Sequence, residues 1–289
     1  MKFLIIGDLH GNKPEIYFKN FDAIIAPGDF CSDAPRKYMF EALTERLKNP
    51  KSKITWYDLV GKKEARKMVE KSIADGRTIL EYLNSFNVPV YALPGNWDWT
   101  GTDREYTWSY LQRDRWKDLI KGLKNVIDLH HKRIDIGDFE VIGHGIISGP
   151  EYPQTKEDLD RYKNKPKELA RIKKDYEQQV KKVNSLFDKA KKSVIFLSHN
   201  VPYNTAIDQI NNPASPRNGQ HFGSVIAKDT IKKYQPLVCI GGHMHEHFTS
   251  VPIGKTIAIN AGFGSYVNVF LELEGKTIKK LEFHKEKTI

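Results

Sequence analysis

The chain has 289 residues, of which 39% are hydrophobic and 28% are charged, and this balance is typical of a globular protein with a sizeable core. Its two cysteines exclude a disulfide framework, and no apolar run approaches the length of a membrane span, so no membrane partner is expected. The net charge of +10 favours anionic partners, either phosphate esters or nucleic acid, although a solvated lysine-rich surface explains it equally well.

The first predicted elements are short strands that are buried on both faces. Apolar runs of four or five residues recur at 3–6, 23–26, 90–93, 194–197 and 237–240. Nearly continuous runs of this length are typical of such strands, and helical patterns lie between several of them. The sequence therefore predicts an α/β layer. The apolar run at the start of the chain is too short for a signal peptide, and together with the few cysteines it favours a cytoplasmic protein.

Two other stretches predict antiparallel hairpins. Residues 131–143 alternate in character around the turn Gly137-Asp138. Residues 248–283 form strands around Gly254-Lys255 and Glu274-Gly275. Together with the buried strands, these hairpins predict two packed sheets with helices outside them, in one domain that spans residues 1–289.

Residues 151–192 predict a helical insertion in this domain. Between Leu169 and Ala190, apolar residues recur at steps of three and four, which is a helical seam. Residues 155–192 hold 13 Lys or Arg against 7 Asp or Glu, a net charge of +6 that a solvated helix face explains better than a nucleic-acid patch. We expect the seam to pack either on the other long helical pattern, at 62–86, or on a second copy of the chain, so the oligomeric state stays open.

Five short polar motifs directly follow predicted strands. They are Asp8-Leu9-His10, Gly28-Asp29, Gly95-Asn96, Ser198-His199-Asn200 and Gly242-His243-Met244-His245. Alone, each motif is more often a turn or a satisfied core histidine than a set of ligands. In this order, after strands whose carboxyl ends converge, they predict one site with seven metal ligands.

The types of ligand indicate which metals bind and what they do. Mixed carboxylate, imidazole and amide ligands suit borderline divalent ions, so we expect manganese first, with iron, nickel or zinc as alternatives. Asp29 is expected to bridge two such ions roughly 3.5–4 Å apart. A hydroxide held between them would attack a phosphate ester, because metal binding lowers the pKa of water to near neutrality. The sequence thus predicts a dinuclear metal-dependent phosphoesterase.

In this order, the motifs resemble those of the calcineurin-like metallophosphoesterase family, over residues 8–245. The resemblance implies a four-layer α/β/β/α sandwich. It also implies two sets of ligands that share one carboxylate. These are Asp8, His10, Asp29 and His245 for one metal ion, and Asp29, Asn96, His199 and His243 for the other.

One position departs from the family pattern, in which a histidine follows Gly-Asn. Here Trp97 follows Asn96, and an indole neither transfers a proton nor binds a metal. Phosphoprotein phosphatases also carry an arginine just before Gly-Asn, where this chain has Pro94. The sequence therefore looks most similar to the small phosphodiesterase branch, which implies a small or nucleotide-like diester as the substrate.

The remaining expectations concern catalysis and substrate binding. The expected catalytic residues are Asp29, Asn96, His199 and His221, and the expected substrate contacts are Asn96, Trp97, Arg217 and His221. Arg217 lies in a loop rich in Asn, Pro and Gly, at 211–220, which we expect to act as a lid. A structural role is the alternative for His221 and for His144, just as ordinary packing is the alternative to base stacking for Trp97.

Two other functions stay open. A nuclease would use the basic helical insertion to hold a nucleic-acid backbone, and its affinity would fall steeply with added salt. A non-catalytic scaffold would bind metal without turnover, and the presence of every expected ligand argues against this function.

Overall fold

Two six-stranded sheets form the centre of the computed structural model, which describes residues 1–49, 51–102, 106–213, 215 and 217–286. The first sheet contains β1 (Lys2–Ile5), β2 (Ala23–Ala26), β3 (Val90–Ala92), β4 (Val126–Asp128), β11 (Val267–Glu274) and β12 (Thr277–Lys285). Its order is β12-β11-β1-β2-β3-β4. β1 to β4 run parallel, whereas β11 and β12 form an antiparallel hairpin beside β1.

The second sheet is also mixed. It contains β5 (Arg133–Ile136), β6 (Phe139–His144), β7 (Ser193–Asn200), β8 (Val238–Gly242), β9 (Ser250–Ile253) and β10 (Thr256–Asn260). Its order is β5-β6-β7-β8-β10-β9, with four parallel central strands and an antiparallel strand at each edge.

The core between the sheets explains why the central strands are apolar at every position. Phe3 and Ile5 of β1 point toward the second sheet and belong to one cluster with Ile195 and Ile240. Leu4 points the other way, into the cluster beneath the helices. All five side chains are fully buried. Because successive side chains of a strand point to opposite faces, a strand covered on both faces needs an apolar residue at each position.

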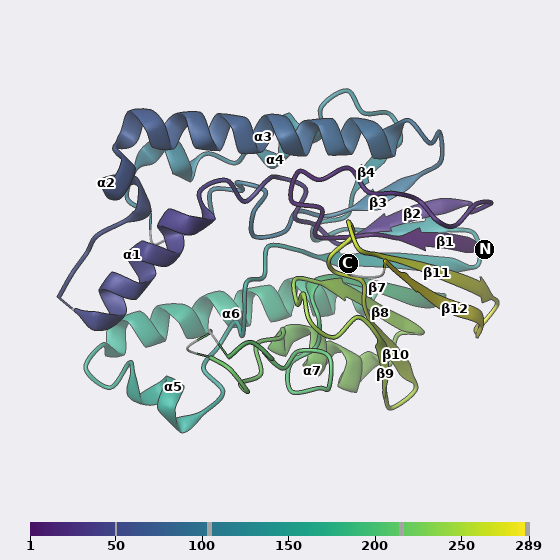
Figure 1. The fold of residues 1–289 in the computed structure, drawn as a ribbon. Helices are drawn as coiled ribbons and strands as arrows, with labels where there is room; N and C mark the ends of the chain where they lie inside the picture. The colour runs from purple at the N-terminus through teal and green to yellow at the C-terminus, as the bar shows by residue number, and fades with distance from the viewer. Residues whose placement is uncertain (50, 103–105, 214, 216, 287–289) are drawn as a thin grey trace.

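Helices cover the outer face of each sheet, so the molecule has four layers (Figure 1). On the side of the first sheet are α1 (Arg36–Lys48), α2 (Trp56–Val60), α3 (Lys62–Asn84), a 3₁₀ helix η1 (Ser109–Gln112) and α4 (Trp116–Ile120). On the side of the second sheet are α5 (Lys156–Asp160), α6 (Pro166–Phe187) and α7 (Val225–Tyr234). α1, α2 and α5 lie beyond the end of the sheets opposite the N-terminus. The α/β/β/α sandwich expected from the sequence is confirmed.

The long helix α6 corrects one expectation. It packs on the second sheet, where Phe187 lies edge-on to Phe196 of β7 and stacks on Tyr234 of α7. α3 covers the opposite face of the molecule, so the expected α3–α6 pair is wrong (Figure 1). The apolar spacing of a helix shows which face is buried but not what covers it. The assignment of residues 151–192 as an insertion in a domain of residues 1–289 stays a prediction. Within the described part of the chain, no helix is both long and apolar enough to cross a membrane.

Candidate metal centre

Sharp turns at the strand ends place the polar motifs. The backbone is left-handed at Asp8 (φ 50°), His10 (46°), Asp29 (58°) and His243 (65°). Residues other than glycine rarely adopt this conformation, and where they do, surrounding contacts hold them in it. Here the backbone N–H of His243 donates to both carboxylate oxygens of Asp8, at 2.9 and 2.8 Å. The N–H of His10 donates to the carbonyl of Asp29 at 2.9 Å, so the first two motifs hold each other.

Six of the seven expected ligands form two clusters. These are Asp8, His10 and His245, and Asp29, His199 and His243, with one ligand atom of each residue within 4.8 Å of the others in its cluster. Oδ2 of Asp29 lies 3.5 Å from Nε2 of His199 in its own cluster. The same oxygen lies 3.8 Å from Nε2 of His10 in the other cluster. One carboxylate oxygen therefore stands between the two clusters.

Atoms with lone pairs face one another in this site. The Nδ1–H of His199 donates to the carbonyl of Pro27 at 2.8 Å, so Nε2 of the neutral ring carries a lone pair. This Nε2 lies 2.8 Å from Oδ1 of Asn96, the seventh expected ligand, which is also an acceptor. The Nε2 atoms of His10 and His245 face each other at 3.4 Å. A cation stabilises such an arrangement, and this mixture of oxygen and imidazole donors fits borderline divalent ions.

Burial and neighbouring charges shift the pKa values of these ligands. Burial raises the pKa of Asp29 well above its usual range, and the charge of Asp8 raises it further. Burial also acts against ionisation of Asp8, but the neighbouring histidines outweigh it and lower the pKa of Asp8 to about 2. Burial lowers the pKa of His10 to about 4 and that of His243 to about 3. His10 and His243 are therefore neutral at pH 7, as metal ligands must be, and a divalent cation relieves the repulsion between the carboxylates.

Two glycines let the motifs approach one another. A Cβ atom at Gly95 would overlap the carboxylate of Asp29, and one at Gly242 would overlap that of Asp8. The glycine that precedes Asn96, and the one that precedes His243, are therefore required by the close approach of these carboxylates to the backbone.

Asp98 is an important residue that the sequence reasoning missed. Its side chain is fully buried and accepts four backbone N–H groups. The donors are Asp29 at 2.9 Å, Phe30 at 2.8 Å, Cys31 at 3.0 Å and Gly95 at 2.8 Å. One carboxylate thus fastens the loop after β2 to the loop after β3, and so positions two of the expected metal ligands. The signal was its place beside Gly95-Asn96, since a buried acid there needs several donors.

A cavity of about 550 Å³ opens beside the clusters. Asn96 and Trp97 line it, together with residues of α1, of α2 and of the segment 99–111. The indole of Trp97 lies edge-on to the ring of His10, with 6.1 Å between the ring centroids.

The three other residues singled out from the sequence lie in different places. Arg217 lines the cavity, and its guanidinium lies over the ring of Phe222, 4.3 Å from the centroid. His221 does not line this cavity, and its Nδ1 lies 2.8 Å from the buried carboxylate of Asp208. His144 is fully buried, and its Nδ1 lies 3.2 Å from Nε2 of His131. The structure thus brings Arg217 to the cavity, and gives His221 and His144 partners outside both clusters.

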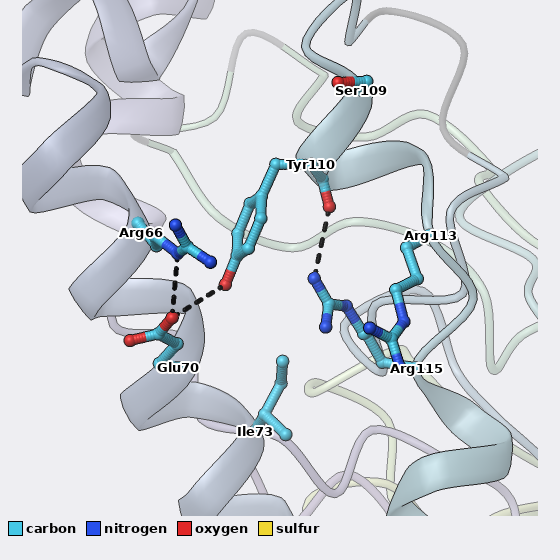
Figure 2. Close-up of a pocket in the computed structure, with 7 residues that line it drawn as sticks. All are labelled: Arg66, Glu70, Ile73, Ser109, Tyr110, Arg113 and Arg115. Atoms are coloured by element: carbon cyan, nitrogen blue, oxygen red, sulfur yellow. Dashed lines mark hydrogen bonds and ion pairs between the residues drawn. The ribbon is translucent and has the colours of Figure 1, made fainter.

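A second cavity, of about 520 Å³, lies between α3 and the segment around η1 (Figure 2). Its lining residues are Arg66, Glu70, Ile73, Ser109, Tyr110, Arg113 and Arg115. Arg66 pairs with Glu70 at 3.0 Å, and Arg113 pairs with Asp118 at 2.6 Å. None of the expected metal ligands lines it, and carboxylates already neutralise two of its three arginines, so we assign it no part in the chemistry.

Comparison with known proteins gives the same fold and a family. Among solved structures, the chain is similar to TT1561 of Thermus thermophilus, with a TM-score of 0.52 and 14% identity over 98% of both chains. It also resembles the phosphopantetheinyl hydrolase PptH from Mycobacterium tuberculosis, with a TM-score of 0.48 and 12% identity over 90% of this chain and 88% of that one. Comparison with curated proteins gives no significant match.

The sequence pattern of one family matches most of the chain. The model of the calcineurin-like phosphoesterases covers residues 1–247, a range that contains both clusters and Asn96. Family membership implies hydrolysis of phosphate esters with divalent metal ions, in agreement with the candidate ligand groups. The chain therefore belongs to the calcineurin-like phosphoesterase family.

Proposed function

We propose that the protein hydrolyses a small phosphodiester at a pair of divalent metal ions. Asp8, His10, Asp29 and His245 would hold one ion, and Asp29, Asn96, His199 and His243 the other. The observation that carries this proposal is the position of Asp29 Oδ2, 3.8 Å from His10 Nε2 and 3.5 Å from His199 Nε2. An oxygen shared in this way suits a bridging ligand, and manganese is the ion we would test first.

The chemistry follows from the metals and from the surrounding side chains. Two bound divalent ions would lower the pKa of water to near neutrality and offset the negative charge that develops on the phosphoryl oxygens. The Asn96 side chain and the His199 ring meet at 2.8 Å at the edge of the cavity, where they position the reacting group. Arg217, in the same cavity, would neutralise a further anionic oxygen of the substrate.

Trp97 favours a phosphodiester with a good leaving group as the substrate, rather than a phosphomonoester with a poor leaving group. The Trp97 indole lies at the cavity beside His10, and it has no proton to give to a leaving alcohol. The loss of a positioned acid typically lowers a rate by roughly 10²–10⁴, most strongly for basic leaving groups. A catalytic role of His221 stays a prediction, since its Nδ1 is engaged by Asp208.

The direct experiment compares bis(4-nitrophenyl) phosphate with 4-nitrophenyl phosphate. Wild-type protein is stripped of metal and reloaded with manganese, nickel, zinc or magnesium, with Asp29→Asn as the variant and Asp118→Asn, a surface acid paired with Arg113, as the control. We expect metal-dependent cleavage of the diester, faster than that of the monoester, which Asp29→Asn loses and Asp118→Asn retains. Faster cleavage of the monoester, or unchanged activity of Asp29→Asn, would contradict the proposal.

The same experiment separates the alternatives that the sequence leaves open. A scaffold would bind metal and cleave neither ester. A nuclease would cleave a nucleic acid far better than the small diester, with activity that falls steeply with added salt. The location in the cytoplasm and the oligomeric state stay predictions from the sequence.

A further inference from the structure

One part of the cavity beside the clusters is an apolar wall. Nine of the lining residues have apolar or aromatic side chains. They are Met39, Ala42, Leu43, Trp56, Trp97, Trp99, Tyr106, Leu111 and Ile146. Within the described part of the chain, no aspartate or glutamate lines the cavity. Such a wall binds an uncharged organic group by burying apolar surface.

The apolar wall continues outside the cavity along one face of α1. Phe40, Leu43 and Leu47 are 53%, 40% and 60% exposed, and three of the six large hydrophobic residues that are exposed in the described chain lie on this helix. Their spacing, i, i+3 and i+7, places them on one face. Leu43 belongs both to this row and to the cavity wall. A chain that leaves the cavity past Leu43 therefore finds one more apolar side chain in either direction along the helix, Phe40 or Leu47.

The cavity also offers positive charge for an anionic headgroup. Arg217 is half-buried, its guanidinium lies on the face of Phe222, and no carboxylate within 4.0 Å pairs with it in the described residues. A guanidinium is costly to bury without an anion, so its place on the cavity wall favours an anionic ligand. The ester group at the clusters and the charge at Arg217 would thus lie at one end of the ligand, and the apolar wall at the other.

Three polar side chains of the cavity offer little to the edge of a nucleobase. Reading the edge of a base takes free amide or hydroxyl groups. The hydroxyls of Thr100 and Thr102 lie 2.9 Å apart and bond to each other, and the Asn96 oxygen is an expected metal ligand that faces Nε2 of His199 at 2.8 Å. A hydrocarbon chain needs none of these groups, and it would also cover the row on α1.

We propose that the natural substrate is an amphiphilic phosphodiester whose hydrocarbon chain lies in this cavity and along the α1 row of Phe40, Leu43 and Leu47. This inference rests on the proposed diesterase function and names the class of its substrate. The ester group meets the metal ligands, a second anionic oxygen meets Arg217, and the chain runs past Leu43.

The test uses methyl, butyl, hexyl and octyl 4-nitrophenyl phosphates, which share one leaving group, with manganese-loaded full-length protein. We expect kcat/KM to rise about three- to fourfold for each methylene that is buried. Leu43→Asp should flatten this rise from the butyl ester onward. Leu47→Asp, farther along the row, should lower kcat/KM for the octyl ester only. Leu59→Asp is the matched control, because Leu59 on α2 is 41% exposed but does not line the cavity. It should keep the wild-type profile.

The outcomes separate this inference from the function on which it rests. If the methyl ester is cleaved but kcat/KM stays flat over the series, the diesterase stands and the amphiphile inference falls. The amphiphile inference also falls if kcat/KM is higher for thymidine 5′-(4-nitrophenyl phosphate) than for the octyl ester. If no ester is cleaved, the proposed function falls. The affinity for octylphosphonate, measured by calorimetry, should then still be at least 100-fold higher than that for methylphosphonate. Leu43→Asp should remove this difference in affinity, and Leu59→Asp should not. Equal binding would overturn the apolar subsite.

Discussion

The carboxylate of Asp98 accepts the backbone N–H of Asp29 at 2.9 Å, so one buried acid positions another. The same carboxylate accepts N–H groups from Phe30, Cys31 and Gly95. It therefore joins the loop that carries Asp29 to the loop that carries Asn96. Hydrogen bonds to a charged acceptor are about twice as strong as neutral ones, and here four of them hold the candidate metal centre together.

Removal of this charge should weaken both the fold and the metal site. Asp98→Asn replaces one acceptor oxygen with an NH₂ group that faces backbone donors. We expect the free energy of unfolding to fall by about 2–4 kcal/mol, and manganese affinity to fall by about 10- to 100-fold, because the ligands lose their orientation. Urea denaturation and calorimetric titration measure the two effects. The surface variant Asp118→Asn should change the free energy of unfolding by less than about 1 kcal/mol. Unchanged metal affinity in Asp98→Asn would refute the positioning role.

Trp97→His should restore the acid that the family pattern has at this position. The side chain lines the cavity beside His10, so a histidine there would reach a leaving oxygen. We expect a gain of about 10- to 100-fold for an alkyl leaving group and little change for 4-nitrophenolate, which leaves without a proton. Rates for a series of leaving groups measure this difference. Trp97→Phe, which supplies no proton, should give no such gain, and equal gains in both variants would show that the effect is steric.

Gly76→Ala in α3 tests how closely this helix approaches the loop after β2. A Cβ atom at position 76 would lie 2.7 Å from Sγ and 2.9 Å from Cα of Cys31. In a helix with room, Gly→Ala stabilises by about 1 kcal/mol. Here we expect destabilisation of about 1–3 kcal/mol by overpacking, measured by urea denaturation. Ala74→Gly, at an exposed position of the same helix, gives the cost of helix propensity alone. Stabilisation by Gly76→Ala would show that the contact is loose.

The pH dependence of stability should reveal His130. Burial lowers its pKa to about 4, and its Nδ1 accepts the N–H of Gly145 at 3.1 Å, which a protonated ring cannot do. Because the folded pKa lies below the unfolded value of about 6.5, the unfolded chain binds the proton first as the pH falls. Stability is therefore complete above about pH 6.5 and is lost toward pH 4, by about 1 kcal/mol per pH unit for this group. His130→Asn should remove that part of the slope. Parallel curves for both proteins between pH 6 and 4.5 would contradict this account.

The sequence predicted most of the fold because the strands are buried on both faces. A continuous apolar run such as 23–26 identifies a strand without any tertiary knowledge. Edge strand β4 was not foreseen, because its residues are only half-buried and its pattern is weak. The predicted packing partner of α6 was wrong for a different reason, because an apolar face on a helix fits any apolar surface.

The candidate site was predictable to the extent that it consists of short motifs at strand ends. The six cluster residues stand directly after apolar runs, so their convergence followed from the parallel sheet. The four hydrogen bonds of Asp98 were not predictable, because they join backbone groups of two loops that are far apart in sequence. The apolar row on α1 was also missed, since exposure of a leucine depends on what the rest of the chain leaves uncovered.

The most direct test of the dinuclear site is the metal content of the purified protein. Manganese-loaded wild type is passed over a desalting column, and metal per chain is measured by mass spectrometry, with His245→Asn and the edge-strand variant His284→Asn alongside. We expect two ions per chain in wild type and His284→Asn, and one in His245→Asn, which loses a ligand of the first cluster only. One ion or none in the wild type, or two in His245→Asn, would contradict a site in which these two clusters each hold a metal ion.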